Sequence, residues 1–377
     1  MSAGRNRNRN WETGIHRGVT AQESTPSYIS PARGGESREG AQAPTIFNDS
    51  RGKFFTLAAA CFLFLLAGNS NAAEKIRVAF VSPSATQSPV WIAKEAGFFA
   101  KQGLDAEVVL LPGSPRMVQT LISGDIDYAI VGASAAMRAR MRGADVVMLA
   151  TTANLSNMKL LVSRDSGIRQ LEDLKGKTLG VSQYGSDADG FARIVLEKAG
   201  LKPDKDVPII QLGGHPQVAA AIAAGKIPAG VLGGLALLTA QKSGATLLTS
   251  GVKLKAAALS GTLATTDGRI QRNRDSVLRF MRAFVEAVRY FKTNPDGTLP
   301  ILRKYMGGIS AEQARVAYDE VVEVFEDLPV PAERGIQSVL DRESDPKAKT
   351  FKPSNFIDLS FLKEIDRSGL VDKIYRK

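Results

Sequence analysis

The sequence has very few of the residues that carry thiol or metal chemistry. Among its 377 residues there is one cysteine, Cys61, and there are two histidines, His16 and His215. These counts exclude a disulfide framework, a zinc finger, a cysteine-ligated iron–sulfur cluster and a Cys–His catalytic pair. We therefore expect no metal site and no cofactor. Any function must depend on carboxylates, hydroxyls, lysines or backbone groups.

The sequence also lacks an apolar run of membrane-spanning length near its N-terminus. The run over residues 54–67 has 14 residues, whereas a membrane helix needs roughly 17–25. Arg51 and Lys53 precede this run and small residues follow it up to Ala73, which is the layout of a secretory signal peptide. We expect residues 1–73 to be a disordered leader plus a cleavable signal peptide at about 51–73, which exports the protein to the periplasm. A short uncleaved anchor is the alternative.

Blocks of like charge are missing after the leader. The whole chain has 49 Lys and Arg against 38 Asp and Glu, a net charge of +11. Residues 74–377 hold 41 basic and 33 acidic residues, so their net charge is +8. Because the basic residues are interspersed with acidic ones, the pattern indicates a solvated surface, and we expect no nucleic-acid partner.

Short β-like runs alternate with helical segments through the exported part. This alternation is typical of an α/β fold with mostly parallel sheets, and the length suits two domains. We expect helices over 90–101, 116–123 and 189–199, then from residue 275 to the break at Asn294–Pro295, and over 311–325. We expect nine strands, at residues 76–81, 106–110, 128–131, 146–150, 160–162, 178–181, 209–212, 230–232 and 246–248.

The chain resembles itself at a spacing of 101 residues. Aligned without gaps, residues 113–147 and 214–248 share nine identities in 35 positions. Most of the shared residues are Gly, Ala and Pro, at positions where turn geometry restricts the choice of residue. The repeat predicts two similar α/β lobes. Chance similarity among small residues is the alternative.

Polar side chains gather in the loops that follow the expected strands of both lobes. Ligands bind beyond the carboxyl ends of parallel strands, and helix N-termini there present free N–H groups. The loops therefore predict a cleft for a small anionic or polar molecule, with helix capping as the alternative for each residue. Tyr184 and Trp91 could add aromatic surface, although Trp91 suits core packing equally well. The candidate ligand-binding residues are Gln87, Ser88, Ser114, Ser134, Asn157, Tyr184, Gly185, Ser186, Asp187 and His215.

Four segments resemble those of a known family. They are residues 90–104 (VWIAKEAGFFAKQGL), 121–132 (LISGDIDYAIVG), 171–181 (LEDLKGKTLGV) and 185–201. In this order they resemble the NMT1/THI5-like, SsuA-type substrate-binding proteins of ABC transporters, which take up nitrate, sulfonates and taurine. The resemblance implies a type II periplasmic-binding-protein fold: two α/β lobes joined by two crossovers around a ligand cleft, with a helical C-terminal extension. Lobe I with the C-terminal helices would comprise residues 74–163 and 251–377, and lobe II residues 164–250.

The resemblance also implies a function. The protein would be the periplasmic solute-binding component of an ABC importer, and no enzyme. It would act as a monomer that captures a small polar organic ligand by lobe closure and delivers it to the membrane permease. The ligand would be sulfonate-, taurine- or nitrate-like, or a pyrimidine or aromatic anion.

The sequence departs from the family pattern at two places. Residues 227–235 (IPAGVLGGL) lack polar side chains, which favours a ligand with an apolar or aromatic part. Asp187 adds a negative charge, which favours a ligand with a hydrogen-bond donor over nitrate. A periplasmic ligand sensor without a transport role, or an enzyme related to thiamine-pyrimidine synthesis, is the alternative function. The yeast enzymes of that kind depend on a Cys-rich segment that this chain lacks.

Overall fold

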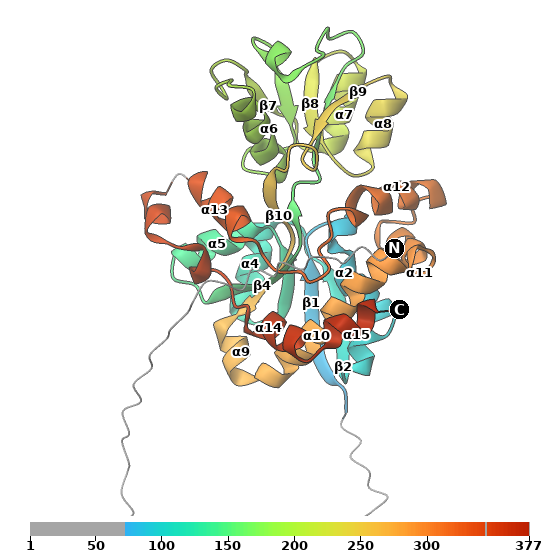
Figure 1. The fold of residues 1–377 in the computed structure, drawn as a ribbon, viewed down its shortest axis with the longest axis vertical. Helices are drawn as coiled ribbons and strands as arrows, with labels where there is room; N and C mark the ends of the chain where they lie inside the picture. Colours follow the sequence, from blue (N-terminus) through green and yellow to red (C-terminus); the bar gives the residue numbers. More distant parts are fainter. Residues whose placement is uncertain (1–71, 344, 377) are drawn as a thin grey trace, which may run out of the picture. The chain divides into compact units, whose positions relative to one another are not determined.

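The computed structural model describes residues 72–343 and 345–376. The expected leader and signal peptide lie outside the described residues, apart from residues 72 and 73. In the described part the chain forms two five-stranded sheets with helices packed on them (Figure 1), which confirms the predicted α/β class. No helix in these two ranges combines the length and the apolar character that a membrane crossing requires.

The first sheet has the strand order β2–β1–β3–β10–β4. Strand β1 runs parallel to β2 and β3, whereas β10 runs antiparallel to β3 and β4. The sheet is therefore mixed, and β10 is a strand that the sequence analysis did not predict. The bounds are β1 (Glu74–Phe80), β2 (Leu104–Leu110), β3 (Tyr128–Val131), β4 (Val146–Leu155) and β10 (Ala257–Thr266).

The second sheet has the strand order β7–β6–β8–β5–β9. Strand β6 runs parallel to β7 and β8, and β5 runs antiparallel to β8 and β9. Since β5 lies in this sheet, the predicted lobe boundary at residue 164 is wrong by one strand. The bounds are β5 (Lys159–Val162), β6 (Leu179–Val181), β7 (Ile209–Gln211), β8 (Ala229–Leu232) and β9 (Thr246–Ser250).

The two sheets repeat one arrangement. In each, the first parallel strand lies between the second and the third, and an antiparallel strand separates the third from the edge strand. Helices α4 (Ser114–Ser123) and α7 (His215–Ala223) precede the third strands, and α5 (Ala133–Met141) and α8 (Ala236–Lys242) follow them. The equivalent helices α4 and α7 begin 101 residues apart, so the structure confirms the predicted repeat.

The predicted helix over 90–101 is interrupted. Helix α2 (Ser88–Glu95) ends before Gly97, and α3 (Phe98–Lys101) begins after it. Gly97 has a φ of +76°, a left-handed conformation that glycine adopts without steric cost. In the second lobe, α6 (Asp187–Lys198) follows β6.

Helices dominate the chain after β10. Phe280 and Phe284 lie on the buried side of α10, and the ring of Phe280 stacks on that of Tyr128 in β3, with ring centroids 3.8 Å apart. The expected break at Asn294–Pro295 is present between α10 and α11. The bounds are α9 (Asp267–Arg272), α10 (Arg274–Thr293), α11 (Pro295–Tyr305), α12 (Ala311–Val322), α13 (Glu333–Asp341), α14 (Ser360–Arg367) and α15 (Leu370–Tyr375).

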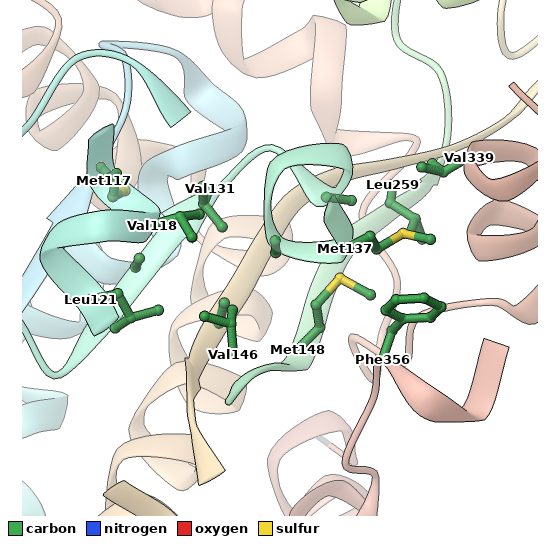
Figure 2. Packing of buried hydrophobic residues seen from close by; sticks show 14 of the residues in the cluster. Met117, Val118, Leu121, Val131, Met137, Val146, Met148, Leu259, Val339 and Phe356 are labelled. Carbon is green, nitrogen blue, oxygen red and sulfur yellow. The ribbon is translucent and has the colours of Figure 1, made fainter. Parts of the chain in front are cut away.

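The C-terminal segment is built into the first sheet's core. Figure 2 shows Met137 of α5, Met148 of β4 and Phe356 gathered in one buried cluster. The N–H of Met148 donates to the carbonyl of Phe356 at 2.9 Å. Burying each large apolar side chain contributes about 1.5–3 kcal/mol, so the C-terminal segment stabilises the first lobe.

The chain passes between the sheets in two neighbouring segments. Residues 156–158 lead from β4 to β5, and residues 251–256 lead from β9 to β10. The N–H of Ser156 donates to the Ala256 carbonyl, and the N–H of Gly251 to the Met158 carbonyl, both at 2.9 Å. A Cβ atom at Gly251 would lie 2.1 Å from the carbonyl oxygen of Ser156, so only glycine allows the two crossovers to approach this closely.

Candidate functional site

The predicted ligand-binding loops lie at one end of each sheet. Because β1, β2 and β3 are parallel, the loops that follow them meet at the carboxyl edge of the first sheet. We call residues 81–88, 111–116 and 132–134 the first edge. The loops after β6, β7 and β8 meet in the same way, and we call residues 182–189, 212–217 and 233–235 the second edge.

Gln87 and Ser88 of the first edge are buried. The Oε1 atom of Gln87 accepts a hydrogen bond from the Val81 N–H at 3.4 Å, so this side chain holds its own loop. The Ser88 side chain is fully buried and its Oγ atom has no hydrogen-bond partner. A ligand can contact these two residues only if the loop moves.

Ser114 and Ser134 of the first edge are more accessible. The Oγ atom of Ser114, at the start of α4, accepts a hydrogen bond from the Gly132 N–H at 3.2 Å. Ser134 lies half-buried in the first turn of α5, and Asn157 lies half-buried in the first crossover. These three polar side chains are placed at the surface that a ligand could reach. Trp91, by contrast, is fully buried and stacks on Tyr305 at 5.1 Å, so it is a core residue.

The Tyr184–Asp187 loop presents an aromatic ring and a carboxylate to solvent. The Tyr184 side chain is 53% exposed, although its hydroxyl donates to the Ile209 carbonyl at 3.0 Å. Ser186 caps α6, because its Oγ atom accepts from the Asp189 N–H at 3.4 Å, and Gly185 donates its N–H to the Asp189 carboxylate at 2.9 Å. The capping alternative thus holds for Ser186.

The Asp187 side chain has solvent-accessible surface, although many protein atoms lie around its carboxyl group. Partial desolvation by these atoms raises the pKa of the carboxyl above the usual value, and the guanidinium of Arg342 acts in the opposite direction. The two groups form no ion pair among the described residues. Atoms of the Arg342 guanidinium lie 3.7–3.8 Å from where a Cβ of Gly190 in α6 would be, so the arginine packs against this helix.

His215 repeats the role of Ser114. Its Nδ1 atom accepts a hydrogen bond from the Gly233 N–H at 2.8 Å, just as Ser114 accepts from Gly132. Each pair is separated by 18 residues, and the two pairs are 101 residues apart. Burial lowers the pKa of His215 below its usual value of 6.5, so the imidazole is neutral near pH 7 and carries its proton on Nε2.

Glu320 of α12 reaches the second edge, and the sequence analysis missed it. Its Oε1 atom accepts a hydrogen bond from the Gly234 N–H at 2.9 Å and lies 3.6 Å from the ammonium group of Lys159. The Glu320 side chain is only 3% exposed. Burial raises the pKa of its carboxyl, while Lys159 and the Gly234 N–H oppose the rise. No sequence signal indicates this contact, because Glu320 lies outside the repeat and 86 residues from Gly234.

Two cavities lie away from the edges. One has a volume of about 580 Å³ and includes Lys75, Asp105 and Asp127, which stand at the amino ends of the first sheet's parallel strands. Another, of about 350 Å³, lies beside α15. Both are open and lined by charges of either sign, so we base the candidate site on the two edges. Among the described residues, no group of three or more His, Cys, Asp or Glu could hold a metal ion.

Comparison with known proteins finds one family and several relatives. A family described as NMT1/THI5 like matches residues 84–298, more than half of the chain. A Brucella abortus binding protein is 32% identical over 137 residues, 36% of this chain and 41% of that protein. The chain thus spans less than half the length of such relatives.

Two further relatives bear more specific names. An aliphatic sulfonates-binding protein of Bacillus subtilis is 29% identical over 245 residues, 62% of this chain and 73% of that protein. A 4-amino-5-hydroxymethyl-2-methylpyrimidine phosphate synthase of Saccharomyces cerevisiae is 30% identical over 155 residues, 40% of this chain and 43% of the enzyme.

Solved structures share the fold. A periplasmic sulfonate-binding protein of Methylobacillus flagellatus matches with a TM-score of 0.66 at 16% identity, over 80% of this chain and 96% of that one. The periplasmic nitrate-binding protein of a Synechocystis species matches with a TM-score of 0.59 at 15% identity, over 80% and 91%. These likenesses confirm the predicted periplasmic-binding-protein fold.

Proposed function

The chain belongs to the NMT1/THI5-like family, and from this premise we propose that it is the exported solute-binding component of an ABC importer. It captures a small polar organic ligand between its two lobes in the periplasm and delivers it to a membrane permease. The ligand is a sulfonate or taurine-like molecule, or a pyrimidine or aromatic anion. The relative named for aliphatic sulfonates supports this class of ligand.

One observation carries the proposal: two sheets of the same topology present polar loops at their carboxyl edges, and the chain crosses between them only twice in the described part. Short crossovers can act as hinges, since a few residues absorb the rotation of one lobe against the other. A ligand that contacts both edges stabilises the closed form over the open form. Ser114, Ser134 and Asn157 supply polar contacts, and Tyr184 supplies a ring.

We propose no catalytic role for the protein. The single histidine of the described part, His215, uses its Nδ1 atom to accept the hydrogen bond of the Gly233 N–H, so this nitrogen is occupied by a structural contact. The yeast synthase aligns with only 40% of this chain. Binding and release, with no covalent step, account for the residues at both edges.

A thermal-shift screen of the exported protein tests the proposal. Sulfonates, aromatic acids, pyrimidines and nitrate are added in turn, and we expect one class to raise the melting temperature. The double variant Ser114→Ala, Tyr184→Ala should lose most of this shift, whereas Ser123→Ala at the exposed end of α4 should keep it. Conversion of any bound compound to a product by the purified protein would contradict the proposal and favour the enzyme alternative.

A further inference from the structure

A buried carboxylate links the two lobes at a point outside the crossovers. We call the described residues up to 155 and from 257 onward the first lobe, and residues 159–250 the second lobe. The Oε1 atom of Glu320 accepts from the Gly234 N–H at 2.9 Å and lies 3.6 Å from the Lys159 ammonium group. Among the hydrogen bonds and ion pairs of the described residues, these two are the only ones that join the lobes away from the crossovers.

Helix α12, which carries Glu320, is fixed to the first lobe. The ring of Tyr318 in α12 stacks on that of Phe291 in α10, with ring centroids 4.8 Å apart. After the helix, the N–H of Glu326 donates to the carbonyl of Thr152 in β4 at 2.9 Å. The Glu320 carboxylate therefore reaches the second lobe from a helix that moves with the first lobe.

The partners of Glu320 belong to the second sheet. Lys159 begins β5, and Gly234 follows β8, the strand that pairs with β5. The loop lies close against the carboxylate, because a Cβ atom at Gly233 would lie 3.2 Å from the Glu320 Oε1 atom and 2.8 Å from the Met158 Cε atom. The Glu320 side chain is almost fully buried, so protein atoms rather than water surround this contact.

Rotation of one lobe against the other must break this link. A hydrogen bond of 2.9 Å is lost when its two atoms separate by about 1 Å more, and close packing restricts the side chain from following. A buried carboxylate that loses its partners costs more free energy than the bond itself contributes. The link therefore favours one relative position of the lobes over positions in which Gly234 has moved away from Glu320.

A second approach between the lobes is less specific. The guanidinium of Arg342, at the end of α13, packs against α6 at Gly190. Its hydrogen bond goes to Ser338 of its own helix, and in the described part it forms no ion pair with the second lobe. Packing of this kind tolerates sliding, whereas the hydrogen bond of Glu320 depends on distance and direction. Glu320 is therefore the stronger restraint.

We infer that Glu320 is a latch between the lobes: fixed to the first lobe through α12, it binds Gly234 and Lys159 and restrains the lobes in the relative position of this structure. The inference rests on the proposed function only in that the lobes rotate. It gives Glu320 no contact with the ligand. Glu320 is a positioning residue, which acts through the second edge and sets the populations of the lobe arrangements.

Distances between the lobes test the inference. Cys61 is the only cysteine of the sequence and lies in the expected leader, so spin labels can be attached at two introduced cysteines. Gln119→Cys in α4 and Lys242→Cys in α8 replace exposed residues, one in each lobe. Electron spin resonance should give a narrow distance distribution for the labelled protein, and the added change Glu320→Ala should about double its width.

Glu320→Asp is the milder variant, which decides the question if Glu320→Ala does not fold. Its side chain keeps the charge but is one methylene group shorter, so it falls short of Gly234. We expect the distance distribution to broaden in this variant as well.

Glu286→Ala is the matched control. Glu286 is likewise a buried glutamate paired with a lysine, with its carboxylate 2.7 Å from the Lys101 ammonium group, but both residues lie in the first lobe. This variant should lose stability without changing the distance distribution. It thus separates release of the latch from general destabilisation.

The outcomes decide the latch and the proposed function separately. Equal distributions for the labelled parent and both Glu320 variants would overturn the latch, and so would equal broadening in Glu286→Ala. The thermal-shift screen of the unlabelled protein then still decides whether a ligand binds. If only the Glu320 variants broaden and no compound of the screen binds, the latch stands and the proposed function fails.

Discussion

The two sheets share a strand order, and the loops at their carboxyl edges hold the same backbone group with different side chains. At the first edge a serine hydroxyl accepts from the N–H of Gly132, and at the second edge a histidine ring accepts from the N–H of Gly233. The next N–H of the second edge, at Gly234, binds the buried carboxylate of Glu320. The repeated topology therefore fixes which backbone groups need acceptors, whereas the acceptors themselves set the charge of each edge.

Removing Glu320 should have the largest effect on stability, because no equivalent carboxylate is present at the first edge. Glu320→Ala leaves the Gly234 N–H and the Lys159 ammonium without their acceptor, and we expect a loss of about 3 kcal/mol in the free energy of unfolding. Asp319→Ala, an exposed neighbour on α12, should change it by less than about 0.5 kcal/mol. Urea denaturation of the two variants measures both values. Equal effects would mean that the contact between α12 and the second edge contributes nothing to stability.

His215 and Ser114, which accept from equivalent N–H groups, should differ by a smaller amount in their effect on stability. His215→Ala leaves the buried Gly233 N–H without a hydrogen-bond acceptor, so we expect a loss of about 2 kcal/mol in the free energy of unfolding. Ser114→Ala should cost only about 0.5 kcal/mol, because the exposed Gly132 N–H can bind water instead. His215→Asn retains an acceptor and should recover part of the loss. Chemical denaturation compares the three variants, and a larger effect at Ser114 would reverse our view of the two edges.

The smallest difference that we expect between the two edges is in how stability depends on pH. The pKa of His215 is lowered below 6.5 in the folded protein, so the unfolded chain binds a proton first as the pH falls. Stability therefore decreases as the pH drops below about 6.5, and it is retained above that value. The difference in unfolding free energy between wild type and His215→Asn should be larger at about pH 7.5 than at about pH 5.5. Ser114→Ala should show no such change.

Much of the fold could be predicted because its signals are local. All nine expected strands are present, since runs such as YAIV of β3 are apolar throughout and buried throughout. The repeat aligned His215 with Ser114, and the structure shows the same kind of contact at both positions, although the contact itself was not predicted. Strand β10 was not predicted, because its sequence AALSGTLATT is rich in small residues and lacks the run of large apolar residues typical of a buried strand. Its place between β3 and β4 depends on pairing with distant strands.

The parts of the site that could not be predicted come from the C-terminal helices. Glu320 and Arg342 lie outside the repeat, and each reaches the second lobe across a long separation in sequence. Helix α12 was expected, yet the direction of its Glu320 side chain depends on packing that no spacing rule supplies. Gln87 and Ser88 carry the predicted polar groups, but neighbouring residues bury them. Residue type alone does not reveal exposure.

The close approach of the two crossovers has a consequence for how the two domains are joined in one chain. Because the Gly251 N–H meets the Met158 carbonyl and the Ser156 N–H meets the Ala256 carbonyl, the second sheet starts and finishes at adjacent points. Residues 159–250 are thus a topological insertion into a host domain whose cut ends already touch. Deleting that stretch and joining the ends with a short glycine linker should leave a continuous host chain, and the excised piece could be transplanted between relatives as one cassette.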